Sequence, residues 1–260
     1  GCLETLINER ALLAEAEKAP TQTIPVPPVA PPATFGRQTF LDQLVADLST
    51  MPLIALRGSA GVGKSHLALA LANHPAVVNA FPDGRAWLEL GPEADRFAAL
   101  GHLLGQLGGS AEAAKTETER AALLRTLLAG RRLLLLLDDV WAVADAKPFL
   151  DGCQLPTRVV LTTRSAQLAA DLHAANHEVP VLDRAPAVAL LAAAGADAAQ
   201  AVALDPAGTD QLAEQLGDLP LALHVAGRHL NRLVASEGAA GAVAQLAADL
   251  ATQTATVLQL

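Results

Sequence analysis

The sequence predicts an α/β fold, with a three-layer domain built on a parallel sheet and a small all-helical domain after it. Short apolar runs alternate with helix-forming stretches over residues 34–181, which is typical of strands and helices in turn. The run 133–137 is apolar at every position, as expected of a central parallel strand covered on both faces. From residue 182 onward, alanine and leucine dominate, and this composition favours helices alone.

The predicted elements follow in chain order. In the α/β domain we expect strands at 53–56, 85–90, 131–139, 158–164 and a short edge strand at 178–181, with helices at 40–48, 66–72, 95–107 and 117–128. In the helical domain, 182–260, we expect helices at 185–194, 208–216, 221–233 and 239–252.

The N-terminal segment 1–33 is predicted to form a helix over 3–18 and then a proline-rich linker. Six prolines between residues 19 and 32 favour extended backbone, so we place a domain boundary there. Because the chain begins with Gly1 and its only methionine is Met51, we expect it to be a piece of a longer polypeptide.

Composition narrows the possible functions. A formal charge of −9 with 18 basic residues argues against a nucleic-acid surface, and no apolar run approaches the roughly 20 residues that span a bilayer. No targeting segment is visible. Cys2 and Cys153 lack metal-type spacing, so we interpret them as free thiols in the cytoplasm, with a disulfide as the alternative.

A phosphate-binding pattern, G-x-x-x-x-G-K-[ST], follows the first predicted strand. Its glycines let backbone N–H groups turn toward phosphate oxygens, Lys64 can reach the β- and γ-phosphates, and the Ser65 hydroxyl can ligate Mg²⁺. A chance match in a glycine-rich turn is the alternative, but a strand before the loop and a helix after it favour phosphate binding. The predicted nucleotide-binding residues here are Gly58, Ser59, Ala60, Gly61, Val62, Gly63, Lys64, Ser65 and His66.

Charged residues end two further predicted strands at the same sheet edge, where open α/β sheets bind ligands. Asp138 can hold the Mg²⁺ shell, and Asp139 can orient or activate a water, so Asp139 and Lys64 are the catalytic candidates. Arg164 can sense a γ-phosphate. The alternatives are a helix-capping or surface acidic pair and a solvated loop arginine.

A histidine pair and a proline offer two further candidate features. His173 and His177 are four residues apart and could share a helix face, but two ligands without a third make a weak zinc site. Pro220 follows a glycine helix stop at Gly217 and suits the first turn of the next helix, a sufficient local role.

Several motifs in order resemble the NB-ARC type of nucleotide-binding module of STAND ATPases, found in apoptotic and plant immune switches and bacterial relatives. The resemblance covers about residues 34–250. Besides the phosphate loop, its motifs are Phe35-Gly36-Arg37, a weaker match over 81–87, Leu134 to Trp141, Val160 to Arg164, and Leu219 to Leu223. Two departures are Gln38, where an acidic residue is usual, and Asp218, where glycine is usual.

The resemblance implies roles for residues outside the loop. Phe35, Gly36 and Arg37 would lie by the adenine, Pro220 would close over it from the first helical subdomain, and Arg164 would read the γ-phosphate. It also implies ADP or ATP with Mg²⁺, upstream effector and downstream winged-helix and sensor domains, and a parent protein that oligomerises on activation. Because the chain ends at Leu260, we expect it to lack the winged-helix lock on ADP and to be monomeric.

The resulting hypothesis is a molecular switch module for signalling or defence that holds nucleotide between its two domains and hydrolyses ATP slowly at most. A continuously cycling P-loop ATPase or a small-molecule kinase is the alternative, and a nucleotide-free interaction scaffold is a third. Turnover distinguishes the first two, because a switch retains ADP and releases little phosphate.

Overall fold

The computed structural model describes residues 34–257, so the predicted helix over 3–18 and the proline-rich linker lie outside the described residues. The described chain divides into two compact units. The first comprises 40–58 and 64–178, and the second comprises 34–39, 59–63 and 179–257. The phosphate loop thus belongs in part to each unit.

A parallel five-stranded sheet forms the centre of the first unit, in the order β2-β3-β4-β1-β5. The predicted α/β class is therefore confirmed. The strands are β1 (Leu53–Arg57), β2 (Gly84–Glu89), β3 (Leu133–Val140), β4 (Arg158–Thr163) and β5 (Ala175–Glu178).

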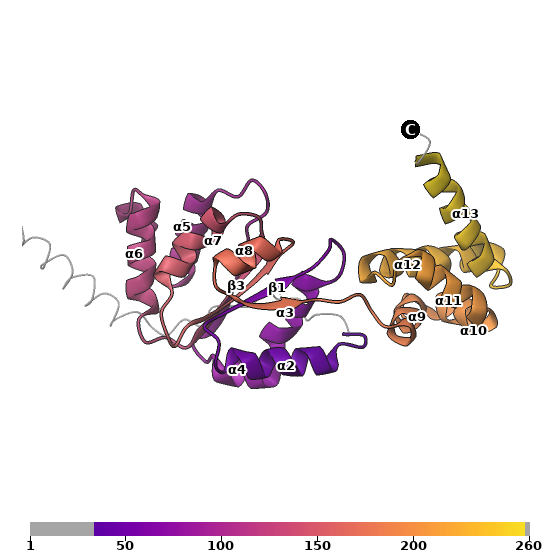
Figure 1. Cartoon of the computed structure of the whole chain (residues 1–260), viewed down its shortest axis with the longest axis horizontal. Helices are drawn as coiled ribbons and strands as arrows, with labels where there is room; N and C mark the ends of the chain where they lie inside the picture. Colours follow the sequence, from indigo (N-terminus) through magenta and orange to yellow (C-terminus); the bar gives the residue numbers. More distant parts are fainter. Residues whose placement is uncertain (1–33, 258–260) are drawn as a thin grey trace, which may run out of the picture. The chain divides into compact units, whose positions relative to one another are not determined.

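Helices cover both faces of this sheet and give the predicted three layers (Figure 1). One face carries α2 (Gln38–Leu48), α3 (Lys64–Asn73) and α4 (Pro75–Ala80). The other carries α5 (Arg96–Gln106), α6 (Glu117–Leu128), α7 (Val143–Gly152) and α8 (Ala166–Asp171), with a short 3-10 turn at Ala111–Ala113 before α6.

Strand β3 is buried on both faces, as its apolar run predicts. Leu133, Leu135 and Leu137 point into the core shared with α5, α6 and α7. Leu134 and Leu136 are equally buried and, because side chains alternate along a strand, they point to the opposite face. The acidic residues that follow this run are consequently held at the carboxyl edge of a rigid strand.

The second unit contains five described helices around one apolar core: α9 (Arg184–Ala192), α10 (Ala196–Leu204), α11 (Pro206–Gln215), α12 (Pro220–Glu237) and α13 (Ala242–Val257). Small residues set the spacing of α9 and α12. A Cβ at Gly227 would lie 2.6 Å from the Leu191 carbonyl oxygen and 3.0 Å from the Ala194 methyl. Only glycine therefore allows this approach of the two helices without a shift.

Three expectations from the sequence need correction. The last strand is β5, at 175–178, whereas 178–181 was predicted; Pro180 in that segment has no N–H to donate to a sheet. His173 and His177 do not share a helix face, because His173 follows α8 and His177 lies in β5. Four further helices, α4, α7, α8 and α10, were not predicted from the sequence.

Candidate functional site

The carboxyl ends of three neighbouring strands bring the predicted phosphate and metal residues to one sheet edge. Strand β1 leads into the phosphate loop, β3 carries Asp138 and Asp139, and β4 ends one residue before Arg164. The order β3-β4-β1 places these three ends side by side. Parallel strands thereby gather groups that are up to 106 residues apart in sequence.

Lys64 begins α3 at the end of the phosphate loop. Its side chain is buried, and Nζ donates a hydrogen bond of 2.9 Å to the Gly58 carbonyl, so the lysine spans the loop. Burial and, secondarily, the Arg164 guanidinium lower the pKa of Lys64, while Asp139 and Asp138 oppose that effect. A buried ammonium between a loop and two carboxylates is well placed to bind an anion.

Ser65, Asp138 and Thr162 form a hydrogen-bonded set of oxygen atoms. The Ser65 hydroxyl donates to Asp138 Oδ1 at 2.8 Å, and the Thr162 hydroxyl donates to the same oxygen at 2.5 Å. Mg²⁺ prefers oxygen ligands and commonly uses one or two protein groups together with substrate phosphates. Ser65 and Asp138 therefore fit the chemistry of a Mg²⁺ site beside the loop.

Asp139 lies at an irregularity in the sheet. The register of β3 against β4 shifts between Leu137 and Val140, and Asp139 takes a positive φ of 54°. Its backbone N–H donates to Thr162 Oγ1 at 2.9 Å, so its partner on β4 is a side-chain oxygen. Bulges of this kind redirect side chains near functional sites. Here the Asp138 carboxylate accepts from Ser65 and Thr162, whereas the Asp139 carboxylate accepts from Trp141.

Arg164 follows β4 and lies close to both Asp139 and Trp141. Its Nε is 4.0 Å from Asp139 Oδ1, and its guanidinium carbon is 4.8 Å from the centre of the Trp141 ring. The indole N–H of Trp141 donates to Asp139 Oδ2 at 2.9 Å. The predicted γ-phosphate sensor is thus grouped with the predicted water-orienting carboxylate.

The second unit groups loop residues with the segment before α2. Gly36 has φ 61°, and a Cβ there would lie 2.4 Å from Pro186 Cγ. Arg37 is buried; its Nη2 donates to the Pro180 carbonyl at 2.7 Å, while Nη1 is buried without a hydrogen bond. Burial lowers the pKa of Arg37. Phe35 packs against the apolar core of the helices.

Loop residues of the same unit also meet the start of α12. The Leu221 N–H donates to the Gly61 carbonyl at 3.1 Å. A Cβ on Gly63, whose φ is 93°, would lie 3.8 Å from Arg37 Nη1 and 4.0 Å from Pro220 Cγ. The structure therefore places Arg37, Gly61, Gly63 and the start of α12 close together within this unit.

Asp218 has a local structural role. It takes a positive φ of 51°, a conformation that glycine and, less often, aspartate adopt. Its carbonyl accepts from the Leu182 N–H at 3.1 Å, and Oδ2 accepts from Arg184 Nη2 at 3.2 Å. The carboxylate thus links the start of α9 to the turn before α12.

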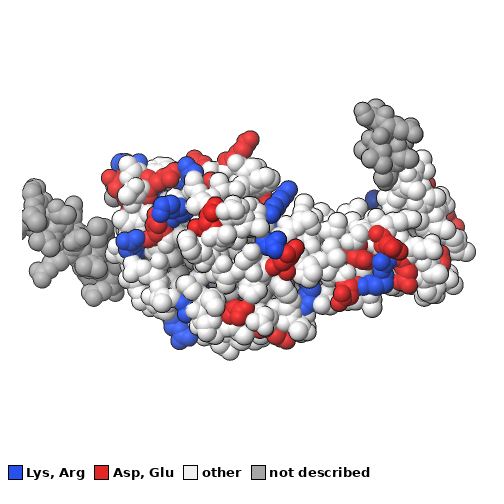
Figure 2. All heavy atoms as spheres, viewed as in Figure 1, with Lys and Arg blue, Asp and Glu red and all other residues white. Residues whose placement is uncertain are grey.

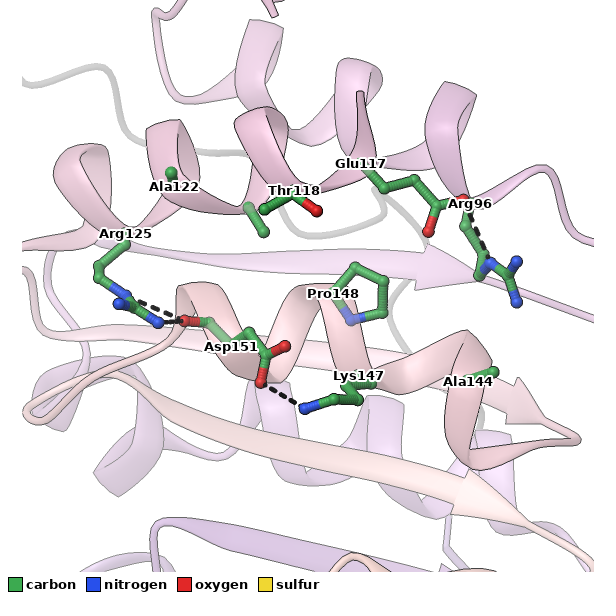
Figure 3. A pocket seen from close by; sticks show the side chains of 10 residues that line it. Arg96, Glu117, Thr118, Ala122, Arg125, Ala144, Lys147, Pro148 and Asp151 are labelled. Carbon is green, nitrogen blue, oxygen red and sulfur yellow. Dashed lines mark hydrogen bonds and ion pairs between the residues drawn. The ribbon is translucent and has the colours of Figure 1, made fainter. Parts of the chain in front are cut away.

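A hollow of about 420 Å³ lies between α6 and α7 (Figure 3). Its three cations are paired. Lys147 Nζ is 3.0 Å from Asp151 Oδ1, Arg96 Nε is 3.4 Å from Glu117 Oε1, and Arg125 Nε donates to the Asp151 carbonyl at 3.0 Å. These pairs satisfy the lining charges internally, so the hollow does not replace the sheet edge as the candidate site.

The distribution of charged side chains and the hydropathy of the helices add two observations. On the face in view, lysine and arginine side chains are interspersed with aspartate and glutamate (Figure 2). Between residues 34 and 257, no helix is long and apolar enough to cross a membrane.

Two residues of this site were absent from the predicted set. Thr162 holds Asp138 and Asp139, and Trp141 contacts Asp139 and Arg164. The available signals were a hydroxyl residue at the end of an otherwise apolar strand and an aromatic residue directly after the acidic pair. Neither signal specifies a role without the strand pairing.

A parallel sheet with a glycine loop, a lysine at the start of the next helix and carboxylates on a neighbouring strand defines a P-loop nucleotide-binding ATPase module. The comparisons with known proteins specify which kind. A family model of the NB-ARC domain matches residues 37–200. The chain therefore belongs to the NB-ARC family.

Three known proteins illustrate this similarity. The chain is 33% identical over 245 residues to regulatory protein AfsR of Streptomyces griseus, covering 86% of this chain and 24% of that protein. It is 26% identical to disease resistance protein RFL1 of Arabidopsis thaliana, covering 87% and 26%. A Pyrococcus horikoshii STAND protein with a tetratricopeptide repeat sensor has a similar fold, with a TM-score of 0.53, 18% identity and coverage of 79% and 31%. The chain thus spans about a quarter of the length of its curated relatives.

Proposed function

We propose that this chain is the nucleotide-binding and first helical part of a STAND signalling switch that binds ADP or ATP with Mg²⁺. The observation that carries the proposal is the grouping of Lys64, Ser65, Asp138, Asp139 and Arg164 at one sheet edge. Mg²⁺, when bound, would neutralise charge on the phosphates. Ser65 and Asp138 would hold it, and Lys64 would bind the β- and γ-phosphates.

Asp139 and Arg164 would distinguish the two nucleotides. Asp139 would orient a water near the γ-phosphate, and Arg164 would contact that phosphate directly. In the structure, Arg164 is half exposed and its Nε lies 4.0 Å from Asp139, so the arginine has a partner from which a phosphate could draw it. Hydrolysis would be slow at most, because a switch depends on the lifetime of each state.

The nucleotide would lie between the α/β and helical domains, with the boundary near residue 181. Phe35, Gly36 and Arg37 would lie by the adenine, Pro220 would close over it, and His66 would lie near the phosphates. The buried Nη1 of Arg37, which has no hydrogen-bond partner, supports a polar ligand on that side. Domain orientation would then respond to the nucleotide through contacts that differ between ADP and ATP.

The wider role belongs to a longer parent protein. We infer upstream effector domains and downstream winged-helix and sensor domains, a cytoplasmic location and a role in signalling or defence. The fragment would be a monomer, and the parent would oligomerise on activation. This inference is supported by the length of the curated relatives and by the similarity to a bacterial regulatory protein and a plant disease resistance protein.

The test is to denature the purified chain, identify released nucleotide by ion-exchange chromatography, and measure phosphate release from added ATP. Stoichiometric ADP with little phosphate release supports the switch. Steady phosphate release, or transfer to an added acceptor, would instead favour a cycling ATPase or a small-molecule kinase. If neither nucleotide raises the melting temperature, a nucleotide-free scaffold is the better explanation.

A further inference from the structure

Asp139, Trp141 and Arg164 form a closed group of three side chains at the ends of β3 and β4. Each oxygen of the Asp139 carboxylate has a different neighbour: Oδ2 accepts from the Trp141 indole at 2.9 Å, and Oδ1 lies 4.0 Å from Arg164 Nε. The guanidinium of Arg164 also lies over the indole ring, 4.8 Å from its centre. Trp141 therefore contacts both charged residues at once.

The hydrogen bond from Trp141 fixes a carboxylate whose backbone is strained. Asp139 has φ 54°, a conformation that few non-glycine residues adopt, and its N–H is already used by Thr162. The hydrogen bond from the Trp141 indole also restricts rotation of the Asp139 carboxylate. Trp141 is 46% exposed, so core burial does not account for its position.

The contact with Arg164 is weak enough to be reversed. An ion pair of 4.0 Å between a half-exposed arginine and a third-exposed aspartate contributes little in water. Stacking of the Arg164 guanidinium on the exposed indole adds a similarly modest free energy to holding Arg164 in place. A γ-phosphate carries more charge than one carboxylate and could therefore draw the guanidinium away.

We propose that Trp141 is a positioning residue that holds Arg164 in the ADP-bound and empty states and releases it when ATP occupies the loop. Because this proposal rests on the proposed nucleotide switch, its test separates the two. The indole acts as a resting place for the arginine, and its N–H keeps Asp139 directed at the sheet edge during the exchange. ATP must therefore compete with Trp141 for Arg164, whereas ADP does not.

Fluorescence of Trp141 tests this proposal directly. The chain has two tryptophans, and Trp87 lies in β2, so Trp87→Phe leaves Trp141 as the single reporter. Acrylamide quenching is measured in this full chain with Mg²⁺-ADP, with a Mg²⁺-bound non-hydrolysable ATP analogue, and without nucleotide. We expect the analogue alone to increase quenching, because the stacked guanidinium leaves the ring. Arg164→Ala should give high quenching in all three conditions.

Calorimetry on tryptophan variants gives a second, independent measurement. Trp141→Leu removes the stacking face, so the preference for the ATP analogue over ADP should rise about two- to fivefold, the size of an exposed cation–π contact. Trp141→Phe keeps an aromatic face and should change the preference less. ADP affinity should stay unchanged in both variants, an outcome that a general loss of structure would not give.

The outcomes separate the two proposals. If calorimetry detects neither nucleotide, the proposed function fails. If both nucleotides bind but quenching is equal with ADP and the ATP analogue, the role of Trp141 is overturned while the proposed function stands. The role of Trp141 is also overturned if Trp141→Leu leaves the nucleotide preference unchanged.

Discussion

Replacement of Thr162 by valine should destabilise the chain more than its size suggests. The side chain is 2% exposed, and its hydroxyl both donates to Asp138 Oδ1 at 2.5 Å and accepts from the Asp139 N–H at 2.9 Å. Valine has nearly the same shape but no hydroxyl, so the carboxylate loses a donor and the N–H loses its acceptor. A buried polar group without a partner costs about 1–3 kcal/mol.

The matched control is Thr162→Ser, which keeps the hydroxyl and removes one methyl. Its expected cost is about 1 kcal/mol, the value of a buried CH₂-sized group. We expect Thr162→Val to lower the free energy of unfolding by about 3 kcal/mol, since both hydrogen bonds of the Thr162 hydroxyl, one donated and one accepted, are lost. The free energy of unfolding is measured by urea denaturation at pH 7. If valine is as well tolerated as serine, the proposed role of the hydroxyl in holding the bulge is wrong.

Three further predictions concern stability. Gly227→Ala should lower the free energy of unfolding by about 1–3 kcal/mol, because the new Cβ would lie 2.6 Å from the Leu191 carbonyl oxygen. Gly105→Ala in α5 is the control: its Cβ would meet nothing within 4 Å, so it should raise that free energy by up to about 1 kcal/mol. Equal effects of the two variants in urea denaturation would contradict this. Thr116→Ala removes the N-cap of α6, which accepts from the Glu119 N–H at 3.2 Å, and should lower the urea midpoint by an amount equivalent to about 1 kcal/mol; an unchanged midpoint would show that the cap is dispensable. Burial raises the pKa of the Cys153 thiol to about 12, so the folded chain keeps a proton that the unfolded chain loses above about pH 8.5. The free energy of unfolding should therefore fall by up to about 1.4 kcal/mol per pH unit between these two pKa values. In a chain whose other cysteine is replaced by serine, Cys153→Ala should flatten this slope in urea titrations at pH 8–11, and an identical slope would refute the shift.

Strands β1 to β4 and the phosphate loop were predictable because each has a local signal. A run of five leucines places apolar side chains on both faces of a strand, which indicates a strand covered on both sides. The loop motif is a fixed spacing of residue types. The helix at 117–128 was predicted with its observed bounds, and Thr116 and Glu119 form a capping box at its start.

Elements without a local signal were missed. Strand β5 has the sequence Ala-Asn-His-Glu and exists because it pairs with β1, a contact that depends on residues more than a hundred positions earlier. Helix α7 has Pro148 in its interior, which argues against a helix locally. In both cases tertiary contacts outweigh local propensity.

The candidate site divides in the same way. The types of Lys64, Ser65 and Asp138 indicate phosphate and metal chemistry without any structure. The roles of Thr162 and Trp141 follow from a register shift between β3 and β4, and a shift of this kind is a property of strand pairing. Sequence therefore predicted which chemistry to expect, and strand pairing showed which neighbours position it.

Calorimetric titration of Mg²⁺-ADP into the nucleotide-free chain tests the central claim most directly. Lys64→Ala is compared with Lys147→Ala, which removes an exposed lysine paired with Asp151 on α7. We expect the wild-type chain and Lys147→Ala to bind Mg²⁺-ADP with the same affinity. Lys64→Ala should lose at least tenfold in affinity, because it removes the buried ammonium that would contact the phosphates. Equal affinity of Lys64→Ala and Lys147→Ala would contradict nucleotide binding at this loop.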